Sequence, residues 1–371
     1  MKVTIKKENL LEGLQTVQSV VGSRTTLPIL SNALLKAEGD NLELVATDLD
    51  LCVSCRVEAK VEVKGATTVP VKKLFALARE MDTFEIELSS DERFVTTIKA
   101  DSSIFKLKGL PPEEFPPLQS FKEEVGFSLP QSSMRRMLKW TSYAVSTDET
   151  RYVLNGVCLS IKSGLLSVVA TDGRRLALVE EQLKEKVPLD FSGNYILPTK
   201  AVNELMRALS DKGEVLITLS QNYAGFNLAE DSKKSIKIVT KLIDGVYPNF
   251  RQVIPQDVKE KAKIDREEFL AALKRLEILT SESSNSVKLT FSKNTLTLSV
   301  NSPEIGEGAE RIAVVYNGQE FSIAFNPRFL IEPLSVLSAD EIEFSFIDEL
   351  SPGVIRIQDP FVYVVMPMRL S

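Results

Sequence analysis

The stretch Val69-Pro70-Val71-Lys72-Lys73-Leu74-Phe75 has two counterparts further along the chain, each with a proline at the same place. They are Leu197-Pro198-Thr199-Lys200-Ala201-Val202 and Asn326-Pro327-Arg328-Phe329-Leu330, and the prolines follow at intervals of 128 and 129 positions. Proline is favoured at a helix start, where its missing N–H would have no partner in any case. The recurrence predicts three equivalent helices in a threefold repeat, and we expect Pro333 to kink or shorten the third.

Each repeat also opens with a helix of its own. The segments that begin at Ile5, Leu129 and Ile264 each lead into apolar residues at helical spacing. Ser132 or Ser133, and Asp265 with Glu268, are residue types that cap a helix N-terminus. The six predicted helices cover residues 8–21, 70–81, 131–141, 199–210, 265–280 and 327–338.

Short alternating strands, separated by turn residues such as Gly39-Asp40-Asn41, fill the rest of each repeat. The proline-rich stretch 111–117 and the charged stretch 255–263 are typical of linkers. We therefore expect an α+β fold of three domains, near residues 1–125, 126–255 and 262–371. Each domain is expected to hold two helices and mostly antiparallel sheets.

Three such domains could form an open array, or two copies could close head to tail into a ring of six units. Twelve helices side by side, each about 10 Å wide, would enclose a hole of roughly 28 Å, which is wide enough for a DNA duplex. The predicted helices carry a net charge of +3, which leaves −9 for the remainder of the chain. This distribution fits phosphates held at the helices, although lysines and arginines that merely solvate helix faces would produce it too.

Composition excludes several classes of chemistry. The chain has 371 residues, 45 basic and 51 acidic side chains, and no histidine. Without histidine there is no Ser-His-Asp or Cys-His nucleophile, no His-ligated zinc and no imidazole base. The start Met1-Lys2-Val3-Thr4-Ile5-Lys6-Lys7-Glu8 has charges where a signal peptide needs an apolar core, and no apolar run approaches a membrane span. These features predict a cytoplasmic protein with no membrane contact.

Cysteine spacing suggests a metal or redox site, but the local pattern argues against one. Cys52-Val53-Ser54-Cys55 lies in a segment with strand-like alternation, where residues i and i+3 point to opposite faces. Only Cys158 remains as a further thiol ligand. We expect reduced thiols buried in a sheet, with no bound metal and no cofactor.

The whole chain resembles the bacterial sliding clamp family, the beta subunit of DNA polymerase III. The most specific segments are Thr26-Leu27-Pro28-Ile29-Leu30, Gly65-Ala66-Thr67-Thr68-Val69-Pro70, Arg151-Tyr152-Val153-Leu154-Asn155-Gly156, Val169-Ala170-Thr171-Asp172-Gly173-Arg174-Arg175-Leu176 and Tyr363-Val364-Val365-Met366-Pro367-Met368-Arg369-Leu370. The resemblance implies a head-to-tail homodimeric ring around double-stranded DNA, with helices lining the hole. It implies a processivity factor and not an enzyme.

The resemblance also implies partners and their sites. The replicative DNA polymerase, a clamp loader ATPase and other replication and repair proteins would bind, through short apolar peptides, in a groove between the second and third domains. The matching groove positions are Leu154, Thr171, Gly173, Arg174, Arg175, Leu176, Pro248, Val253, Val364, Val365, Met366, Pro367, Met368, Arg369 and Leu370. Two methionines and several aliphatic residues make a surface that adapts to different peptides, and Arg175 and Arg369 would supply hydrogen bonds at its rim.

The groove assignment has alternatives and local departures. An alternating apolar terminus can simply be the last strand of a core, although Pro367 disfavours a central strand. Three positions depart from the family pattern, with Arg174 in place of a histidine, Gln252 in place of an arginine and Ser284 in place of an aromatic residue. These departures affect which peptides are preferred and not whether the groove exists.

The resemblance places DNA contacts at Arg24, Lys72, Tyr152 and Lys200. It places the dimer interface at Phe105 and Leu107 of the first domain and at Ile278 and Leu279 of the third. Ser102 and Ile104 replace familiar arginines there, so we expect Lys106 and Lys108 to face the acidic residues Glu304, Glu307 and Glu310.

Two other classes of function compete with this interpretation. Asp48 and Asp172 lie in equivalent Ala-Thr-Asp triplets and could be paired acids of an enzyme, but a repeated triplet at a strand end is more simply a turn. A peptide-binding scaffold that does not hold DNA is the second alternative, because groove and ring are separate inferences.

Overall fold

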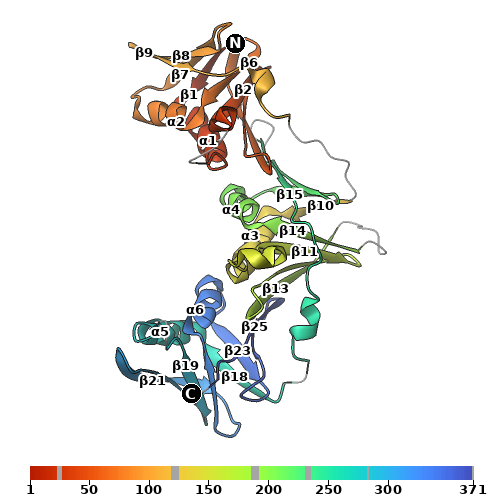
Figure 1. The fold of residues 1–371 in the computed structure, drawn as a ribbon, viewed down its shortest axis with the longest axis vertical. Helices are drawn as coiled ribbons and strands as arrows, with labels where there is room; N and C mark the ends of the chain where they lie inside the picture. The colour runs from red at the N-terminus through yellow and green to blue at the C-terminus, as the bar shows by residue number, and fades with distance from the viewer. Residues whose placement is uncertain are drawn as a thin grey trace. The chain divides into compact units, whose positions relative to one another are not determined.

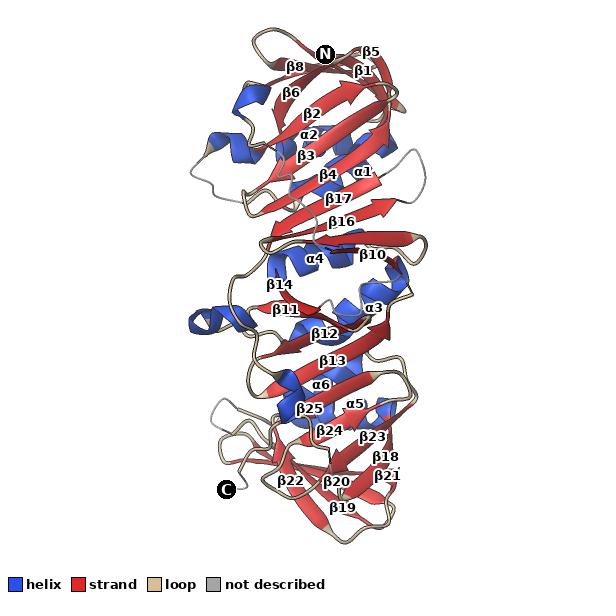
Figure 2. Cartoon of the chain, turned by 90° about the vertical axis from the view of Figure 1, so that its right-hand side faces the viewer, coloured by secondary structure: helices blue, strands red, loops and turns tan. Residues whose placement is uncertain are grey.

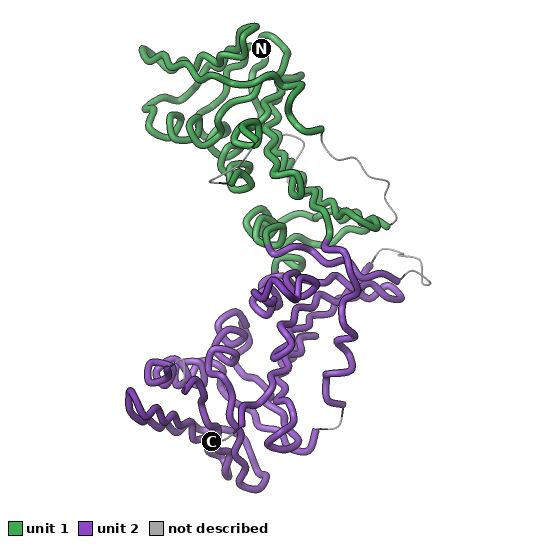
Figure 3. Tube along the Cα trace, in the orientation of Figure 1, with its two compact units in different colours: residues 1–135, 200–242 green, residues 136–199, 243–371 purple. Residues whose placement is uncertain are grey.

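The computed structural model describes residues 1–22, 27–117, 125–184, 192–229, 235–256, 258–281 and 284–369. The chain divides into two compact units, shown in different colours in Figure 3. Unit 1 comprises residues 1–135 and 200–242, and unit 2 comprises residues 136–199 and 243–371. The division between the two units therefore falls within the second repeat. Each unit combines strands from two repeats.

Unit 1 contains a five-stranded sheet, ordered β5-β1-β7-β8-β9, and an eight-stranded sheet, ordered β10-β15-β16-β17-β4-β3-β2-β6. The β17–β4 pair, which aligns Ser235 with Arg56 and Thr240 with Leu51, joins the strands of two repeats into one sheet. The strands are β1 (Lys2–Lys6), β2 (Asn32–Glu38), β3 (Asn41–Thr47), β4 (Leu51–Glu58), β5 (Lys60–Val63), β6 (Gly65–Pro70), β7 (Glu85–Ser90), β8 (Val95–Ala100), β9 (Ser103–Lys108), β10 (Val125–Pro130), β15 (Glu214–Leu219), β16 (Tyr223–Ala229) and β17 (Ser235–Lys241).

Unit 2 contains one twelve-stranded sheet, ordered β14-β11-β12-β13-β25-β24-β23-β18-β21-β20-β19-β22. The β13–β25 pair, which aligns Arg175 with Val365 and Leu176 with Val364, connects the two repeats here. Its strands are β11 (Gly156–Lys162), β12 (Leu165–Thr171), β13 (Arg175–Gln182), β14 (Ser192–Pro198), β18 (Glu260–Asp265), β19 (Val287–Ser292), β20 (Thr295–Ser302), β21 (Gly306–Val315), β22 (Phe321–Phe325), β23 (Glu341–Phe346), β24 (Gly353–Arg356) and β25 (Phe361–Val365).

The six predicted helices are present, with ends within a few residues of those expected (Figure 1). They are α1 (Lys7–Gln18), α2 (Val71–Glu80), α3 (Gln131–Thr141), α4 (Thr199–Ala208), α5 (Arg266–Glu277) and α6 (Pro327–Val336). Short 3₁₀ segments lie at η1 (Pro28–Ser31), η2 (Pro112–Glu114), η3 (Ser142–Ala144), η4 (Glu149–Leu154) and η5 (Phe250–Val253). Each of α2, α4 and α6 begins at or directly after its repeated proline, as the sequence predicts.

Apolar faces of the helices form the cores beneath the sheets. In unit 1, α1 packs on β4 and β3 through Leu10, Leu14 and Val17, all fully buried. It lies on one face of the eight-stranded sheet, behind the strands in Figure 2. In unit 2, α5 and α6 pack against each other, with Leu273 and Leu330 among the fully buried residues. No helix of the described ranges is long and apolar enough to cross a membrane.

One predicted helix cap and one predicted shortening are absent from the structure. Ser132 and Ser133 do not cap α3, because β10 runs to Pro130 and the helix starts at Gln131, which leaves both serines inside the first turn. Pro333 does not shorten α6, which has ten residues like α2 and α4. By contrast, Asp265 caps α5 as predicted and accepts a hydrogen bond from the Glu268 backbone N–H at 2.8 Å.

The cysteines are buried and free, as the sequence predicts. Cys52 belongs to an apolar cluster with Leu34, Val45 and Phe115, while Cys55 is fully buried further along β4. Burial raises the pKa of the Cys52 thiol to about 11 and that of Cys158 to about 12, so both thiols stay protonated at neutral pH. No group of three or more metal-ligating side chains occurs in the described part of the chain.

Candidate functional site

An apolar cluster in unit 2 brings together segments that are far apart in the sequence. Leu154 at the end of η4, Leu176 on β13 and Val364 on β25 belong to one cluster with Tyr247 and Phe250. The segment that holds Tyr247 and Phe250 continues into Val253, whose side chain is exposed, and Pro248 is exposed as well. Four predicted groove segments therefore converge on one patch of unit 2.

The turn between β12 and β13 is fixed by its own side chains. The Thr171 hydroxyl donates to the Arg175 carbonyl at 2.6 Å and accepts from the Gly173 N–H at 3.1 Å. Asp172 accepts from the backbone N–H groups of Arg174 and Arg175 at 2.9 and 3.1 Å. Gly173 has a φ of +84°, a left-handed conformation that glycine adopts without strain. The turn presents Gly173 and Arg174 to solvent.

An equivalent turn in unit 1 explains the repeated Ala-Thr-Asp triplet. The Thr47 hydroxyl donates to the Leu51 carbonyl at 3.0 Å, and Asp48 accepts from the Leu51 N–H at 2.7 Å. Asp48 and Asp172 each organise a strand connection in a different unit. Their geometry gives both carboxylates a structural task, as the simpler interpretation of the sequence proposed.

Arg175 is a buried support of this patch and not a donor at its rim. Its side chain is 7% exposed, and all three guanidinium nitrogens have partners. Nε donates to Asp172 at 3.1 Å, Nη2 donates to the Tyr143 carbonyl at 2.6 Å, and Nη1 pairs with Glu332. The rim role that the sequence suggests for Arg175 is therefore wrong, because every donor nitrogen is already engaged inside the protein.

Aromatic rings complete the surroundings of Arg175. The guanidinium carbon lies 4.5 Å from the centroid of the Phe329 ring and 5.8 Å from that of Tyr143. Burial opposes the charge of Arg175, but Tyr363, Glu332 and Asp172 outweigh it and hold the pKa of Arg175 above its ordinary value. The charged guanidinium thus ties α6 to the β12–β13 turn.

The chain beyond β25 borders the same patch. The strand ends at Val365, after which the Met366 N–H donates to the Arg174 carbonyl at 2.8 Å and the Met368 N–H donates to the Ala324 carbonyl at 2.7 Å. Pro367 lies between these two donors and has no backbone N–H, so it needs no acceptor. Met366 and Met368 are 44% and 38% exposed. The tail therefore completes the core with Val364 and Val365 and offers an exposed apolar surface with its methionines. Leu370 lies outside the described residues.

Two predicted DNA-contacting lysines extend toward the end of α1 in unit 1. Lys200 Nζ donates to the Val20 carbonyl at 3.1 Å and pairs with Asp48, while Lys72 Nζ donates to the Gly22 carbonyl at 3.3 Å. Both lysines are exposed, as is Tyr152 in unit 2. The carbonyls of Val20 and Gly22 follow α1, which ends at Gln18. Lysine side chains are favoured as donors to carbonyls at a helix C-terminus. Arg24 lies outside the described residues.

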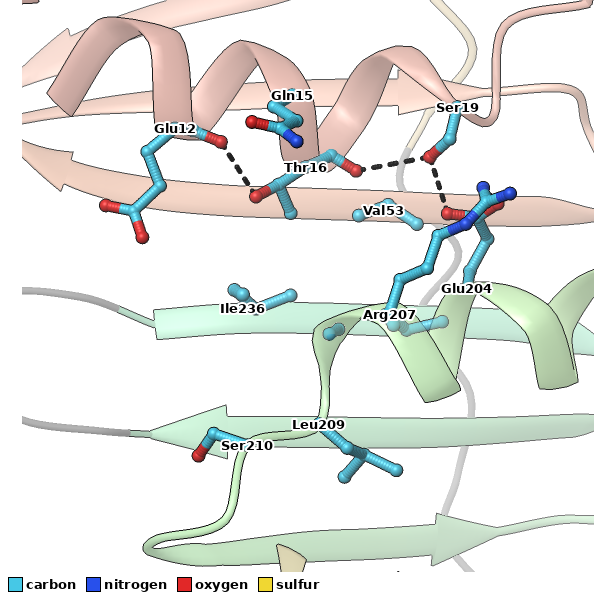
Figure 4. A pocket seen from close by; sticks show the side chains of 12 residues that line it. Glu12, Gln15, Thr16, Ser19, Val53, Glu204, Arg207, Leu209, Ser210 and Ile236 are labelled. Atoms are coloured by element: carbon cyan, nitrogen blue, oxygen red, sulfur yellow. Dashed lines mark hydrogen bonds and ion pairs between the residues drawn. The ribbon is translucent and has the colours of Figure 1, made fainter. Parts of the chain in front are cut away.

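A hollow of about 490 Å³ separates α1 from α4 in unit 1 (Figure 4). The Ser19 hydroxyl donates to the Glu204 carboxylate at 2.5 Å, and Glu204 also accepts from Arg207 at 2.8 Å. Glu204 is buried, so both partners compensate its loss of hydration. Residue types alone did not single out Glu204, because its partner Ser19 lies 185 positions away.

Among the strands whose backbone edge lacks a neighbouring strand in the described ranges are β9 and part of β21. β9 ends its sheet and pairs only with β8, and its Phe105 is exposed while Leu107 is half-buried. β21 pairs with β20 along its length but meets β18 only at Val314 and Val315, which leaves residues 306–313 open on one side. The Leu279 side chain packs against Gly308 of this edge and leaves no room for a Cβ there. The neighbouring Ile278 is exposed.

One acidic residue predicted at the dimer interface already has a partner within the chain. Glu310 accepts two hydrogen bonds from Arg275, at 2.7 and 2.6 Å. This contact with Arg275 lowers the pKa of Glu310. Glu304 and Glu307 belong to the same acidic segment, and their contact with Lys106 and Lys108 stays a prediction.

Comparisons with family models, relatives and solved structures all point to the same family over the whole chain. Family models of the DNA polymerase III beta subunit match in order, with the N-terminal domain at residues 1–119, the central domain at 128–249 and the C-terminal domain at 251–369. The beta sliding clamp of Chlamydia pneumoniae is 38% identical over 372 residues, which cover all of this chain and 99% of that protein. Sliding clamp structures from Pseudomonas aeruginosa and Bacillus subtilis match with TM-scores of 0.94 and 0.93 at 35% and 30% identity, over the full length of both chains in each case.

Proposed function

This chain belongs to the family of the DNA polymerase III beta subunit, the bacterial sliding clamp, and we propose that separate surfaces of it hold DNA, close a dimer and capture partner peptides. Membership of the family makes the chain a processivity factor of DNA replication and not an enzyme. We place this function in the cytoplasm and assign the three clamp domains to residues 1–125, 126–255 and 262–371. The repeated helix starts after Pro70, Pro198 and Asn326 support this division.

The peptide site is the convergence of four segments on the apolar cluster of unit 2. Leu154, Leu176 and Val364 provide a buried floor, and Val253, Met366 and Met368 provide exposed apolar side chains around it. Flexible methionines fit peptides of different sequence, which suits a surface shared by many partners. The replicative polymerase, the clamp loader ATPase and other replication and repair proteins would each dock a short apolar peptide here.

The dimer interface is the open edge of β9 against the open edge of β21 in a second copy. An unpaired strand edge favours pairing with another chain, and two different edges on one chain produce a head-to-tail contact. Phe105 and Leu107 on β9 would meet Ile278 and Leu279 beside β21. Lys106 and Lys108 are available to face Glu304 and Glu307, so charge complementarity supports the same register.

The DNA surface is the helical one. The six helices carry 13 basic and 8 acidic side chains, whereas the whole chain has a net charge of −6. Lys72 and Lys200, together with Arg24 and Tyr152, would contact backbone phosphates, which depend on charge and not on base sequence. Such contacts let a ring slide.

A topological experiment tests encirclement. After loading by the clamp loader, the dimer should remain on nicked circular DNA, should be lost when the circle is cut once, and should stay on cut DNA whose ends are blocked. Retention on linear DNA with free ends would contradict encirclement. A protein that binds clamp peptides but is never retained on circles would instead be the peptide scaffold without DNA.

A further inference from the structure

A second hollow, of about 660 Å³, lies on unit 2 beside the tail. Its floor is the outer face of the strands β22, β19, β20 and β21, where Ala324, Lys288, Ser299 and Ala309 stand opposite one another in one row across the sheet. Three of these four side chains are small, so the row leaves space above the sheet around Lys288. Arg369 of the tail lines the hollow from one side and Glu307 of β21 from another.

Hydroxyl groups cover much of the remaining lining. The Ser284 hydroxyl donates to the Asn301 carbonyl at 2.9 Å, which fixes it at the wall, and Ser286 and Ser299 also line the hollow. Ile323, the neighbour of Ala324 along β22, is fully buried in the core. The hollow is thus a polar site and differs in chemistry from the apolar cluster around Leu176.

The charges of the hollow favour a single negative group. Lys288 and Arg369 are both exposed, and neither has an ion-pair partner among the residues that the structure describes. A carboxylate between an ammonium and a guanidinium would form charge-assisted hydrogen bonds. Glu307 also lines the hollow, but in the proposed dimer it would face Lys106 or Lys108 of the second copy, which leaves Lys288 and Arg369 as the charges open to a ligand.

The hollow is continuous with the proposed peptide site through the tail. Met366 bonds to Arg174 beside the apolar cluster, Met368 bonds to Ala324 in the floor of the hollow, and Arg369 follows directly. A peptide that lies along Met366 and Met368 and extends past them therefore reaches Lys288. We propose that this hollow binds an aspartate or glutamate side chain in the segment that flanks the apolar anchors of a partner peptide. This inference rests on the proposed peptide site.

The test uses the intact dimer and peptides that share one set of apolar anchors. Each pair of peptides differs only in the flanking segment, which carries aspartate in one peptide and asparagine in the other. In the first pair the flanking segment precedes the anchors, and in the second pair it follows them. In one of the two pairs, the aspartate peptide should bind about 3- to 10-fold more tightly at low salt, since two exposed charge pairs contribute modestly. Added salt should reduce the difference.

Variants of the clamp locate the preference. Lys288→Gln should bring the two affinities close together, and Lys288→Glu should reverse their order. Lys293→Gln is the matched control, because Lys293 is an exposed lysine in the β19–β20 turn and does not line the hollow. It should leave the aspartate preference unchanged. Equal binding of both peptides in both pairs, or a preference that survives Lys288→Gln, would overturn the inference while the peptide site stands. If no anchor peptide binds at all, the peptide site itself fails.

Discussion

The Tyr363 hydroxyl donates a 2.6 Å hydrogen bond to the Phe329 carbonyl, the acceptor that would otherwise bond to the backbone N–H of residue 333. Residue 333 is a proline and has no N–H, so the helix α6 leaves this carbonyl without its usual partner. Tyr363 is fully buried on β25 and supplies the missing donor from the adjoining strand. The strand that leads into the tail is thereby joined to α6.

We expect Tyr363→Phe to lower the free energy of unfolding by about 1–2 kcal/mol, because the buried carbonyl loses its donor. Chemical denaturation of the dimer at fixed protein concentration measures this loss. Pro333→Ala restores a backbone N–H next to the same carbonyl, so it should offset much of the loss in the double variant. If Tyr363→Phe has the same effect with and without the Pro333→Ala substitution, the bond has no such role.

Stability should fall at alkaline pH. Burial raises the pKa of Tyr143, Tyr247 and Tyr363 above the ordinary value near 10. Above about pH 10 the unfolded chain releases these protons while the folded chain retains them, so the free energy of unfolding decreases as pH rises. Denaturation at a series of pH values between 8 and about 11 measures the slope. Tyr143→Phe should make the slope shallower, and an unchanged slope would count against the buried phenol as its source.

The contrast between Arg175 and Arg328 tests how the proposed peptide site is supported. Arg175→Ala should cost about 3–5 kcal/mol, because it removes the buried cation of Asp172 and leaves Glu332 with only the exposed Arg328. Arg328 pairs with the same Glu332 but is exposed, so Arg328→Ala should cost less than about 1 kcal/mol. Thermal unfolding and peptide titration give both readouts. Similar losses from the two substitutions would show that the buried network does not carry the support.

Local signals in the sequence identify the helices, whereas the contacts of the site depend on distant residues. Pro70, Pro198 and Pro327 predict helix starts because their effect involves only neighbouring backbone. Pro333 does not shorten α6, and Tyr363, 34 positions beyond Phe329 in the sequence, supplies the donor that the proline lacks. Likewise, residue type suggests a rim role for Arg175, but Glu332 is 157 positions further along the chain and makes it a buried support.

Removal of Met366–Ser371 should abolish peptide binding and leave the dimer intact. The deletion takes away two exposed methionines and the backbone bonds to Arg174 and Ala324, while β25 keeps its pairing with β13 up to Val365. Peptide titration by fluorescence anisotropy and sedimentation of the same sample measure the two properties separately. Peptide affinity that survives the deletion would remove the tail from the binding site.

The open edge of β9 makes a prediction about assembly. Phe105→Asp places a charge on an exposed ring of this edge, and we expect it to weaken the dimer at least about tenfold, since buried aromatic residues dominate interface energies. Phe84→Asp is the control, because Phe84 is also exposed in unit 1 but precedes β7 and lies outside the edge strand. Sedimentation equilibrium measures both dissociation constants. A dimer that weakens equally with either substitution, or with neither, would exclude the β9 edge as the contact.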